Sequence, residues 1–315
     1  MKRIASLLLA LCLCLSCVAV AGAEGKTYQV GVLQLVQHVA LDAATQGFQD
    51  ALKEALGDSV NIEVKNASGE FNNCTTIAND FVAGNVDLIM ANATPALQAS
   101  VGATGDIPIL GTSITDYGTA LDIADWTGTT GINVSGTADL APLDGQAEIL
   151  NELFPDAKTV GLIYCSAEAN SLYQVRTIAG YLNELGYETK EYAFADSNDV
   201  ASVTESACEC DVLYIPTDNT AATYTETIAN VVIPAGKPVI AGEEGICVGC
   251  GVATLTISYY DLGYATGKMA VKVLTEGADI STMPVEYAPQ FTKKYNAANC
   301  EALNIQVPED YVAIE

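Results

Sequence analysis

The chain has 315 residues, of which 50% are hydrophobic and 17% are charged. This composition supplies apolar side chains for a packed core and excludes a disordered chain. The formal net charge of -26 makes binding of nucleic acid or of anionic lipid headgroups to the folded surface unfavourable. The length fits one large α/β domain or two lobes of ordinary size.

The first residues have the features of an export signal. Lys2 and Arg3 form a positive end, an apolar stretch covers residues 4–20, and Ala21-Gly22-Ala23 is an A-x-A cleavage site. We therefore expect residues 1–23 to be a signal peptide and the protein to be exported to the periplasm or the cell surface. The apolar run ends in a processing site and is shorter than the roughly 20 residues of a membrane-spanning helix.

A lipoprotein signal is a second interpretation of the same stretch. Leu15 and Ser16 precede Cys17, which would become the lipidated first residue after cleavage. The residue three before Cys17 is Cys14 where leucine is usual, so both interpretations stay open. Under the second one, the lipid anchor is the only membrane contact that we expect.

Three of the ten cysteines lie in this leader, which leaves an odd number in the body of the chain. Cys247 and Cys250 have the C-x-x-C spacing that can serve zinc or a redox disulfide. No cluster of Cys or His nearby completes four zinc ligands. We expect structural thiols, with one local disulfide as an open alternative, and no metal.

From residue 28 onward, short apolar runs alternate with amphipathic stretches, which is typical of a parallel sheet with crossover helices. Apolar residues at helical spacing between Leu41 and Ala55 predict the first helix, which Gly57 ends. Residues 77–82 indicate a second helix. The strands predicted for this half are residues 28–35, 60–64, 86–91 and 107–111.

The same order of elements returns after residue 150. Apolar residues at helical spacing between Leu172 and Leu185 predict a helix that Gly186 ends. The strands predicted for this half are residues 159–165, 187–194, 211–216 and 237–242. Each half has enough strands and helices to close a core of its own, so the repeat indicates two lobes.

We therefore predict an α/β fold of two doubly wound parallel-sheet lobes joined by a hinge. The expected N-terminal lobe is residues 26–135 and the expected C-terminal lobe is residues 136–258. The stretch 128–140 is rich in Gly, Thr and Ser and is expected to form the first crossover between the lobes. A helix at about 259–277 should return to pack on the first lobe. The sequence does not assign the tail, 278–315, to either lobe.

Polar residues follow the predicted strands in both halves. Because a doubly wound sheet binds its ligand beyond the carboxyl ends of the strands, these residues are the candidates for ligand contact. They are Gln34, His38, Thr94, Ser113 and Asp116 in the first half, and Asn170, Ser171, Asp218, Asn219 and Glu243 in the second.

Several of these candidates stand at expected helix starts. Thr94 before Pro95 has the pattern of an N-cap with proline at the first helical position, which leaves backbone N–H groups free for a carboxylate. A purely structural cap explains the same pattern. Asp218 stands at an equivalent start in the second half, and we expect its carboxylate to meet a cationic group such as a ligand's ammonium.

The sequence does not favour catalysis or cofactor binding. His38 is the only histidine, which removes every mechanism that needs two, and no G-x-S-x-G motif is present. The stretch Gly263–Lys268 is one residue too short for a phosphate loop, and no G-x-G-x-x-G follows the first strand. We expect a protein that is not an enzyme and has no cofactor.

The stretches at the strand ends resemble the ABC transporter substrate-binding proteins of the tryptophan and tyrosine transport type. The similar stretches are "QHVALDAATQGF" at 37–48, "ANATPALQA" at 91–99, "SAEANSLYQV" at 166–175, "IPTDNT" at 215–220 and "AGEEG" at 241–245. The resemblance implies a type I periplasmic-binding fold whose lobes close on a small ligand, an aromatic or other hydrophobic amino acid. It also implies an ABC permease and an ATPase as partners. We expect a monomer.

One residue departs from the family pattern. Tyr117 follows Asp116 where the family usually has proline, and we expect this change to reshape the pocket for the ligand's side chain. A ligand-sensing module for a membrane receptor would use the same fold and is the alternative function. Permease and ATPase genes beside this one would favour transport over sensing.

Overall fold

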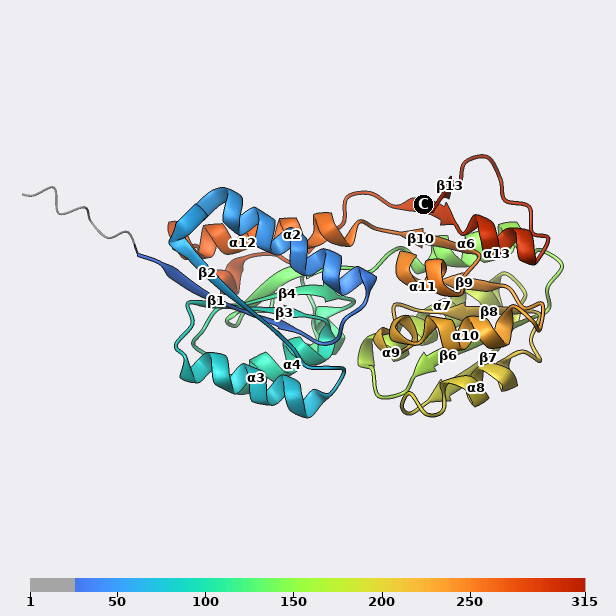
Figure 1. Ribbon diagram of the computed structural model, residues 1–315, viewed down its shortest axis with the longest axis horizontal. Helices are drawn as coiled ribbons and strands as arrows, with labels where there is room; N and C mark the ends of the chain where they lie inside the picture. The colour runs from blue at the N-terminus through green and yellow to red at the C-terminus, as the bar shows by residue number, and fades with distance from the viewer. Residues whose placement is uncertain (1–25, 315) are drawn as a thin grey trace, which may run out of the picture.

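The computed structural model describes residues 26–314. The predicted signal peptide and Cys17 lie outside the described residues. The described chain forms two α/β lobes that lie side by side along the long axis of the molecule, as Figure 1 shows. Within the described range, no helix has the length and hydropathy to span a bilayer.

The first lobe is built on a parallel sheet with the strand order β11-β5-β4-β3-β1-β2. β3 and β4 are buried along their whole length, as strands covered on both faces are. The strands are β1 (Tyr28–Gln34), β2 (Val60–Asn66), β3 (Leu88–Asn92), β4 (Ile109–Ile114), β5 (Val134–Ala138) and β11 (Glu286–Tyr287).

The second lobe is built on a sheet with the order β13-β12-β10-β9-β8-β6-β7. All its pairs are parallel except that of β10 with β12. The strands are β6 (Thr159–Cys165), β7 (Glu188–Phe194), β8 (Val212–Ile215), β9 (Val239–Ala241), β10 (Ala253–Thr256), β12 (Thr292–Tyr295) and β13 (Val312–Ala313).

Helices cover the sheets of both lobes (Figure 1). The first lobe has α2 (Val39–Leu56), α3 (Phe71–Ala83), α4 (Thr94–Ala103), α5 (Tyr117–Ala120) and α12 (Tyr259–Val271). The second lobe has α6 (Leu143–Leu153), α7 (Ala169–Glu184), α8 (Val200–Ala207), α9 (Asn219–Thr223), α10 (Thr225–Val232), α11 (Glu244–Gly249) and α13 (Ala297–Ala302).

The chain crosses between the lobes at three places. It passes from β5 to α6 through residues 139–142, from β10 to α12 through 257–258, and from β11 to β12 through 288–291. The tail therefore contributes to both lobes: β11 pairs with β5 of the first sheet, and β12 pairs with β10 of the second.

α12 returns from the second lobe and packs along α2 (Figure 1). Two glycines allow the close approach: a Cβ at Gly47 would overlap the backbone of Tyr260, and one at Gly263 would overlap the backbone of Ala44. Small residues at such crossings bring helix backbones together. This pair of helices ties the second crossing firmly to the first lobe.

The structure corrects the expectation that the stretch 128–140 is only a crossover. Its second part is β5, a fully buried strand inside the first sheet. The polar side chains of β5 are tolerated there because they are hydrogen-bonded: Ser135 Oγ donates to Met283 O at 3.0 Å, and Thr137 Oγ1 lies 2.8 Å from Thr266 Oγ1. The first crossing begins at Asp139, directly after β5.

All seven cysteines among the described residues are free thiols, and only Cys208 is partly exposed. The local disulfide that the sequence left open is not formed. Burial raises the pKa of the Cys300 thiol to about 11 and that of Cys247 well above its ordinary value. These groups therefore pack as small apolar side chains.

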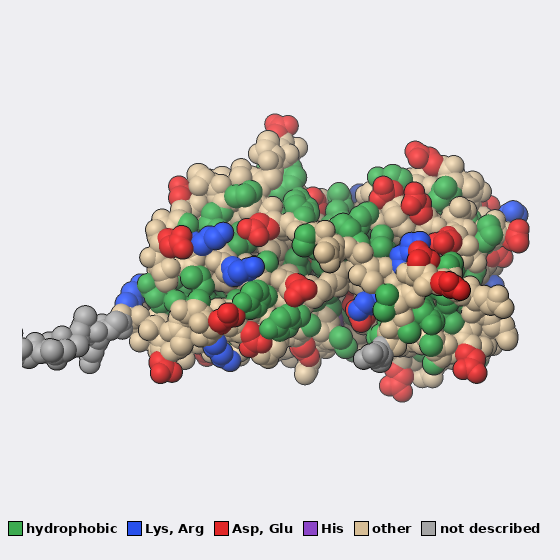
Figure 2. Space-filling model, turned by 90° about the horizontal axis from the view of Figure 1, so that it is seen from above, with side chains coloured by type: hydrophobic (Ala, Val, Ile, Leu, Met, Phe, Trp, Pro, Cys, Tyr) green, Lys and Arg blue, Asp and Glu red, His purple; other side chains and the backbone are tan. Residues whose placement is uncertain are grey.

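Acidic side chains are spread over both lobes on the face shown in Figure 2. The basic side chains that have ionic partners pair with acids at the surface, as Lys293 does with Glu152 at 2.9 Å and with Asp310 at 3.0 Å. Pairs as exposed as these contribute little to stability. Their main effect is to neutralise some of the acidic side chains at the surface.

Candidate functional site

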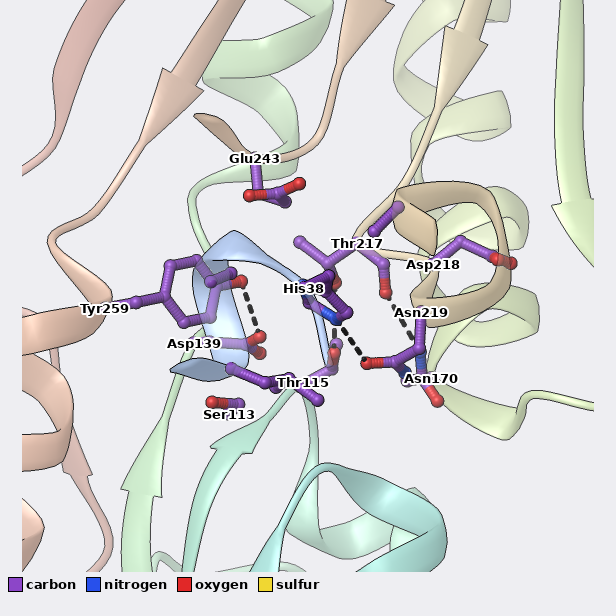
Figure 3. A pocket seen from close by; sticks show the side chains of 13 residues that line it. His38, Ser113, Thr115, Asp139, Asn170, Thr217, Asp218, Asn219, Glu243 and Tyr259 are labelled. Atoms are coloured by element: carbon purple, nitrogen blue, oxygen red, sulfur yellow. Dashed lines mark hydrogen bonds between the residues drawn. The ribbon is translucent and has the colours of Figure 1, made fainter. Parts of the chain in front are cut away.

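A small cavity lies between the lobes, where the carboxyl ends of the two sheets face each other (Figure 3). Its volume is about 10 Å³, close to what one water molecule needs. No Lys or Arg lines it. The lining residues are His38, Ala40, Leu41, Ser113, Thr115 and Asp139, then Asn170, Thr217, Asp218, Asn219, Ala222, Glu243 and Tyr259.

The cavity brings together six of the ten residues that the sequence nominated: His38, Ser113, Asn170, Asp218, Asn219 and Glu243. Their contact with a ligand stays a prediction. The other four nominated residues, Gln34, Thr94, Asp116 and Ser171, do not line it. The lining adds polar groups that the nomination missed, namely Thr115, Asp139, Thr217 and Tyr259.

Gln34 is used inside the first lobe. Its Nε2 donates to Asp42 Oδ1 at 2.6 Å, and its Oε1 accepts from Thr45 Oγ1 at 2.6 Å. The side chain is buried, and Nε2 also donates to Val36 O at 2.9 Å. Gln34 therefore fixes the connection from β1 to α2 and leaves no group for a ligand.

Thr94 is not the N-cap that the sequence indicated. α4 begins at Thr94 itself, the preceding Ala93 is the cap residue with a φ of 90°, and no side chain caps the helix. Pro95 thus stands one position further into the helix than expected. The hydroxyl of Thr94 is buried in the first turn of α4, and Thr94 does not line the cavity.

Asp116 and Ser171 have local roles. Asp116 caps the short helix α5 by accepting from the N–H of Thr119 at 2.7 Å. Ser171 is fully buried in the first turn of α7, where its hydroxyl lies 3.3 Å from Asn170 Nδ2. Neither side chain reaches the cavity.

Tyr117 is buried in the first lobe and does not line the cavity, so its effect on the pocket for the ligand's side chain stays a prediction. Its ring is buried in the first lobe, and its hydroxyl donates to Thr137 O at 3.2 Å. The hydroxyl occupies space over β4 and β5 that a Cβ at Gly111 or Gly136 would take. The ring also stacks on Trp126, with centroids 6.1 Å apart. Tyr117 is a core residue of the first lobe.

Two carboxylates at the cavity act as helix caps. Asp218 accepts from the N–H of Ala221 at 2.8 Å with Oδ1 and from the N–H of Cys165 at 2.6 Å with Oδ2. Glu243 accepts from the N–H groups of Gly245 and Ile246, one on each oxygen. Burial raises the pKa of each to about 7, and these hydrogen bonds oppose the rise.

A third buried carboxylate, Glu168, organises the start of α9. Its Oε1 accepts from the backbone and hydroxyl of Thr220, each at 2.9 Å. Its Oε2 accepts from the backbone N–H of Asn219 at 3.0 Å, from Asn219 Nδ2 at 2.6 Å and from Asn170 Nδ2 at 3.2 Å. Both oxygens of Glu168 are thus fully used within the second lobe.

Through Asn219, Glu168 also determines which ring nitrogen of His38 carries the proton. Because Asn219 Nδ2 points at Glu168, its Oδ1 faces His38 Nε2, 3.3 Å away across the cavity. An amide oxygen only accepts, which assigns the proton to Nε2. Burial lowers the pKa of His38, so the ring is neutral near pH 7. Its Nδ1 is then a bare acceptor.

Asp139 differs from the other acids of the cavity. Its Oδ2 accepts from the hydroxyl of Tyr259 at 2.8 Å, but its buried Oδ1 has no hydrogen-bond partner (Figure 3). Burial raises its pKa to about 6, although the bond from Tyr259 and the nearby hydroxyl of Thr115 oppose the rise. Sequence reasoning missed Asp139 because β5 was read as part of a crossover. The polar residues of β5 leave no apolar run before Asp139, so the sequence carried no clear signal for its position at a strand end.

Further contacts join the lobes around the cavity. Thr115 Oγ1 of the first lobe lies 3.4 Å from Thr217 Oγ1 of the second. Gln174 Nε2 donates to both hydroxyls, at 3.3 Å and 2.6 Å respectively. The lobes are therefore in direct polar contact at the cavity. A larger cavity of about 420 Å³ opens beside it, with Leu35, Phe71 and Tyr224 among its apolar walls.

The polar side chains of the site are donors and acceptors of hydrogen bonds. Within residues 26–314 no group of three or more His, Cys, Asp or Glu side chains could hold a metal ion. The neutral imidazole of His38 contacts an amide, and the acids are helix caps or are held by tyrosine. Its chemistry is that of hydrogen-bond recognition.

Comparisons with known proteins agree with this description. A family model described as "ABC transporter substrate binding protein" matches residues 29–314. A curated "Tyrosine-binding protein" of Clostridioides difficile is 35% identical over 285 residues, which cover 89% of this chain and 82% of that protein.

Two solved structures are similar in fold and sequence. One is an ABC domain from Streptococcus pneumoniae in complex with L-Trp, with a TM-score of 0.86, 33% identity and coverage of 90% of this chain and 97% of that one. The other is the ligand-free, open structure of a substrate-binding protein with adhesive properties from Clostridium difficile, with a TM-score of 0.70, 35% identity and coverage of 91% and 99%. These relatives are binding proteins, and this chain is likewise not an enzyme. The chain belongs to the ABC transporter substrate-binding protein family.

Proposed function

We propose that this protein captures a hydrophobic or aromatic amino acid outside the cytoplasm and delivers it to an ABC importer by closing its two lobes. One observation carries the proposal. Four buried polar atoms that line the cavity have no partner: His38 Nδ1, Ser113 Oγ, Asp139 Oδ1 and Asn170 Oδ1. Unpaired buried polar atoms are costly and rare, so their gathering from both lobes indicates a place for a polar ligand.

The chemistry of these four atoms complements an α-amino acid. Asp139 Oδ1, Asn170 Oδ1 and His38 Nδ1 are acceptors, and an ammonium group offers three N–H donors. The orientation of the Asn170 amide follows from its Nδ2, which donates to Thr217 O at 3.0 Å. The hydroxyl of Ser113 can donate to a carboxylate. The names of the relatives, with tyrosine and L-Trp as ligands, support an aromatic side chain.

Closure of the lobes is supported by their contacts and by the two structural comparisons. At nearly equal sequence identity, the chain is more similar to the L-Trp complex than to the ligand-free, open structure. A cavity of about 10 Å³ cannot hold an amino acid. The lobes must therefore separate to admit the ligand and then close around it, and its side chain can extend toward the larger cavity beside the site.

Export and partners complete the proposal. The predicted signal peptide places the protein outside the cytoplasm, held at the membrane through Cys17 if that residue is lipidated. An ABC permease and its ATPase are the proposed partners, in keeping with the family. The protein is proposed to act as a monomer.

A panel of ligands tests the function. The purified mature protein should gain thermal stability with L-tyrosine, L-tryptophan or another hydrophobic L-amino acid, and not with sugars, phosphates or nucleotides. A ligand that binds only the folded state at a hundredfold excess over Kd adds about 2.7 kcal/mol to the free energy of unfolding. A shift with sugars alone would refute an amino-acid ligand.

A further inference from the structure

We propose that Asp139 receives the ammonium group of the ligand and that Tyr259 is the positioning residue that aims its carboxylate. The inference rests on the proposed function and names the charged contact within that site. It departs from the sequence-based expectation, which gave the ammonium contact to Asp218.

Four buried carboxylates lie at or beside the cavity. They differ in how many of their oxygens accept a hydrogen bond. Asp218 and Glu243 accept a backbone N–H on each oxygen, and Glu168 accepts several donors on each. Asp139 alone has an oxygen, Oδ1, that is buried and without a donor. A ligand cation can pair with Asp139 without displacing any hydrogen bond.

Within the described part of the chain, no cationic side chain lines the cavity around Asp139. No Lys or Arg lines the cavity, and Glu243 adds negative charge nearby. A buried carboxylate in such a place is unfavourable unless a cation joins it. A ligand ammonium supplies that cation and forms a charge-assisted hydrogen bond, which is stronger than a neutral one.

Tyr259 limits the ways in which Asp139 can turn. Its hydroxyl donates to Oδ2 at 2.8 Å, so Oδ1 is the oxygen left for the ligand. Each residue lies at or directly beside a crossing between the lobes. Asp139 directly follows β5, and Tyr259 begins α12 directly after the second crossing. The ammonium group would thus bind at the hinge, where its contact persists while the lobes open and close.

Calorimetric titration of wild type and variants tests the assignment. The probes are L-tyrosine and L-tryptophan, each beside the analogue in which hydrogen replaces the amino group. Asp139→Asn should weaken binding of the amino acid by at least about tenfold. The affinity of this variant for the analogue should stay within about twofold of the wild-type value. Tyr259→Phe should cause a smaller loss, again for the amino acid only.

Asp144→Asn is the matched control, because Asp144 is an exposed acid at the start of α6 that does not line the cavity. It should leave both affinities unchanged. Wild-type affinity for the amino acid in a folded Asp139→Asn variant would overturn the assignment. Equal loss of amino acid and analogue would also overturn it, because the residue would then support the fold of the site. If wild-type protein binds no hydrophobic or aromatic L-amino acid of the ligand panel, the proposed function itself is wrong.

Discussion

His38 of the first lobe and Asn219 of the second are joined across the cavity, with Nε2 of the imidazole 3.3 Å from Oδ1 of the amide. The bond exists only while the lobes are close. Glu168 accepts a hydrogen bond from the Asn219 amide, and the oxygen of that amide accepts one from the imidazole. These two hydrogen bonds keep Nδ1 of His38 as an acceptor at the cavity.

Asn219→Ala should weaken ligand binding by about two- to tenfold, because one neutral hydrogen bond between the closed lobes contributes about 0.5–1.5 kcal/mol. Most of the change should appear as faster dissociation in stopped-flow fluorescence, since the bond forms after the ligand has entered. Ser206→Ala, which removes an exposed hydroxyl bonded to Ser202 O within α8, away from both cavities, is the control. An unchanged dissociation rate in Asn219→Ala would show that the contact does not hold the lobes closed.

Affinity for the amino acid should depend on pH through Asp139. Burial raises the pKa of Asp139 to about 6 in the structure with the lobes in contact, and a bound ammonium lowers it because the cation favours the charged carboxylate. Binding therefore requires loss of a proton below that pKa, and affinity should fall by about tenfold from about pH 7.5 to about pH 5.

Other titratable groups lie near Asp139, and their contribution to the pH dependence must be measured separately. Tyr259 and Tyr117 have pKa values raised well above 10 and do not titrate in this range. Glu243 has a pKa near 7 and can add a slope of its own. Titrations of Asp139→Asn across the same range should show a clearly flatter profile. An identical profile in wild type and variant would assign the pH dependence to Glu243 or another group.

Closure should be visible by small-angle scattering. A ligand that contacts residues of both lobes favours the state in which both can reach it, so the radius of gyration should fall when the ligand is added. In this structure the lobes are already joined by the polar contacts of Thr115, Thr217 and Gln174. An unchanged radius at saturating ligand would mean that the lobes do not close on binding.

The helix pair α2 and α12 gives a prediction for stability. Gly263→Ala places a Cβ against the backbone of Ala44, so the helices must move apart, at a cost of about 1–3 kcal/mol of unfolding free energy. Gly180→Ala in α7 is the matched control, since a Cβ there has open space and the better helix propensity of alanine should add up to about 1 kcal/mol. Urea unfolding of both variants measures the difference. Equal stability of the two would contradict the close packing.

The sequence predicted the parts of the site whose signals are local. Asp218 and Glu243 are helix caps after apolar strands, and residue order alone places them at the carboxyl edge of a sheet. Asp139 and Tyr259 were not predicted, because they meet only when the two crossings lie side by side. Thr94 was misplaced by one position, since the strained backbone of Ala93 that sets the helix start leaves no mark in the sequence.

The strands were predicted well where they are apolar and failed where polar residues are buried. β6 matches its predicted range, 159–165, whereas β5 was read as a crossover because it contains Ser135, Gly136 and Thr137. Hydrogen bonds from these side chains to the tail and to α12 satisfy them in the core. Periodicity cannot report such partners, which come from segments more than a hundred residues away.

Asp218→Asn separates a structural carboxylate from a ligand contact. Both oxygens of Asp218 accept backbone N–H groups, so an amide can keep the cap at Ala221 but turns its NH₂ toward the N–H of Cys165, 2.6 Å from the present oxygen. Two donors then face each other in the core, which should lower the free energy of unfolding by about 1–3 kcal/mol. Burial raises the pKa of Asp218 to about 7, so ionisation of the native side chain lowers wild-type stability as the pH rises toward that value, and the loss in the variant should be smaller above about pH 7 than at acid pH. Urea unfolding would measure that loss, and calorimetry of the folded variant should show affinity for the amino acid within a few-fold of wild type. A loss of affinity specific to the amino acid, with unfolding unchanged, would return the ammonium contact to Asp218.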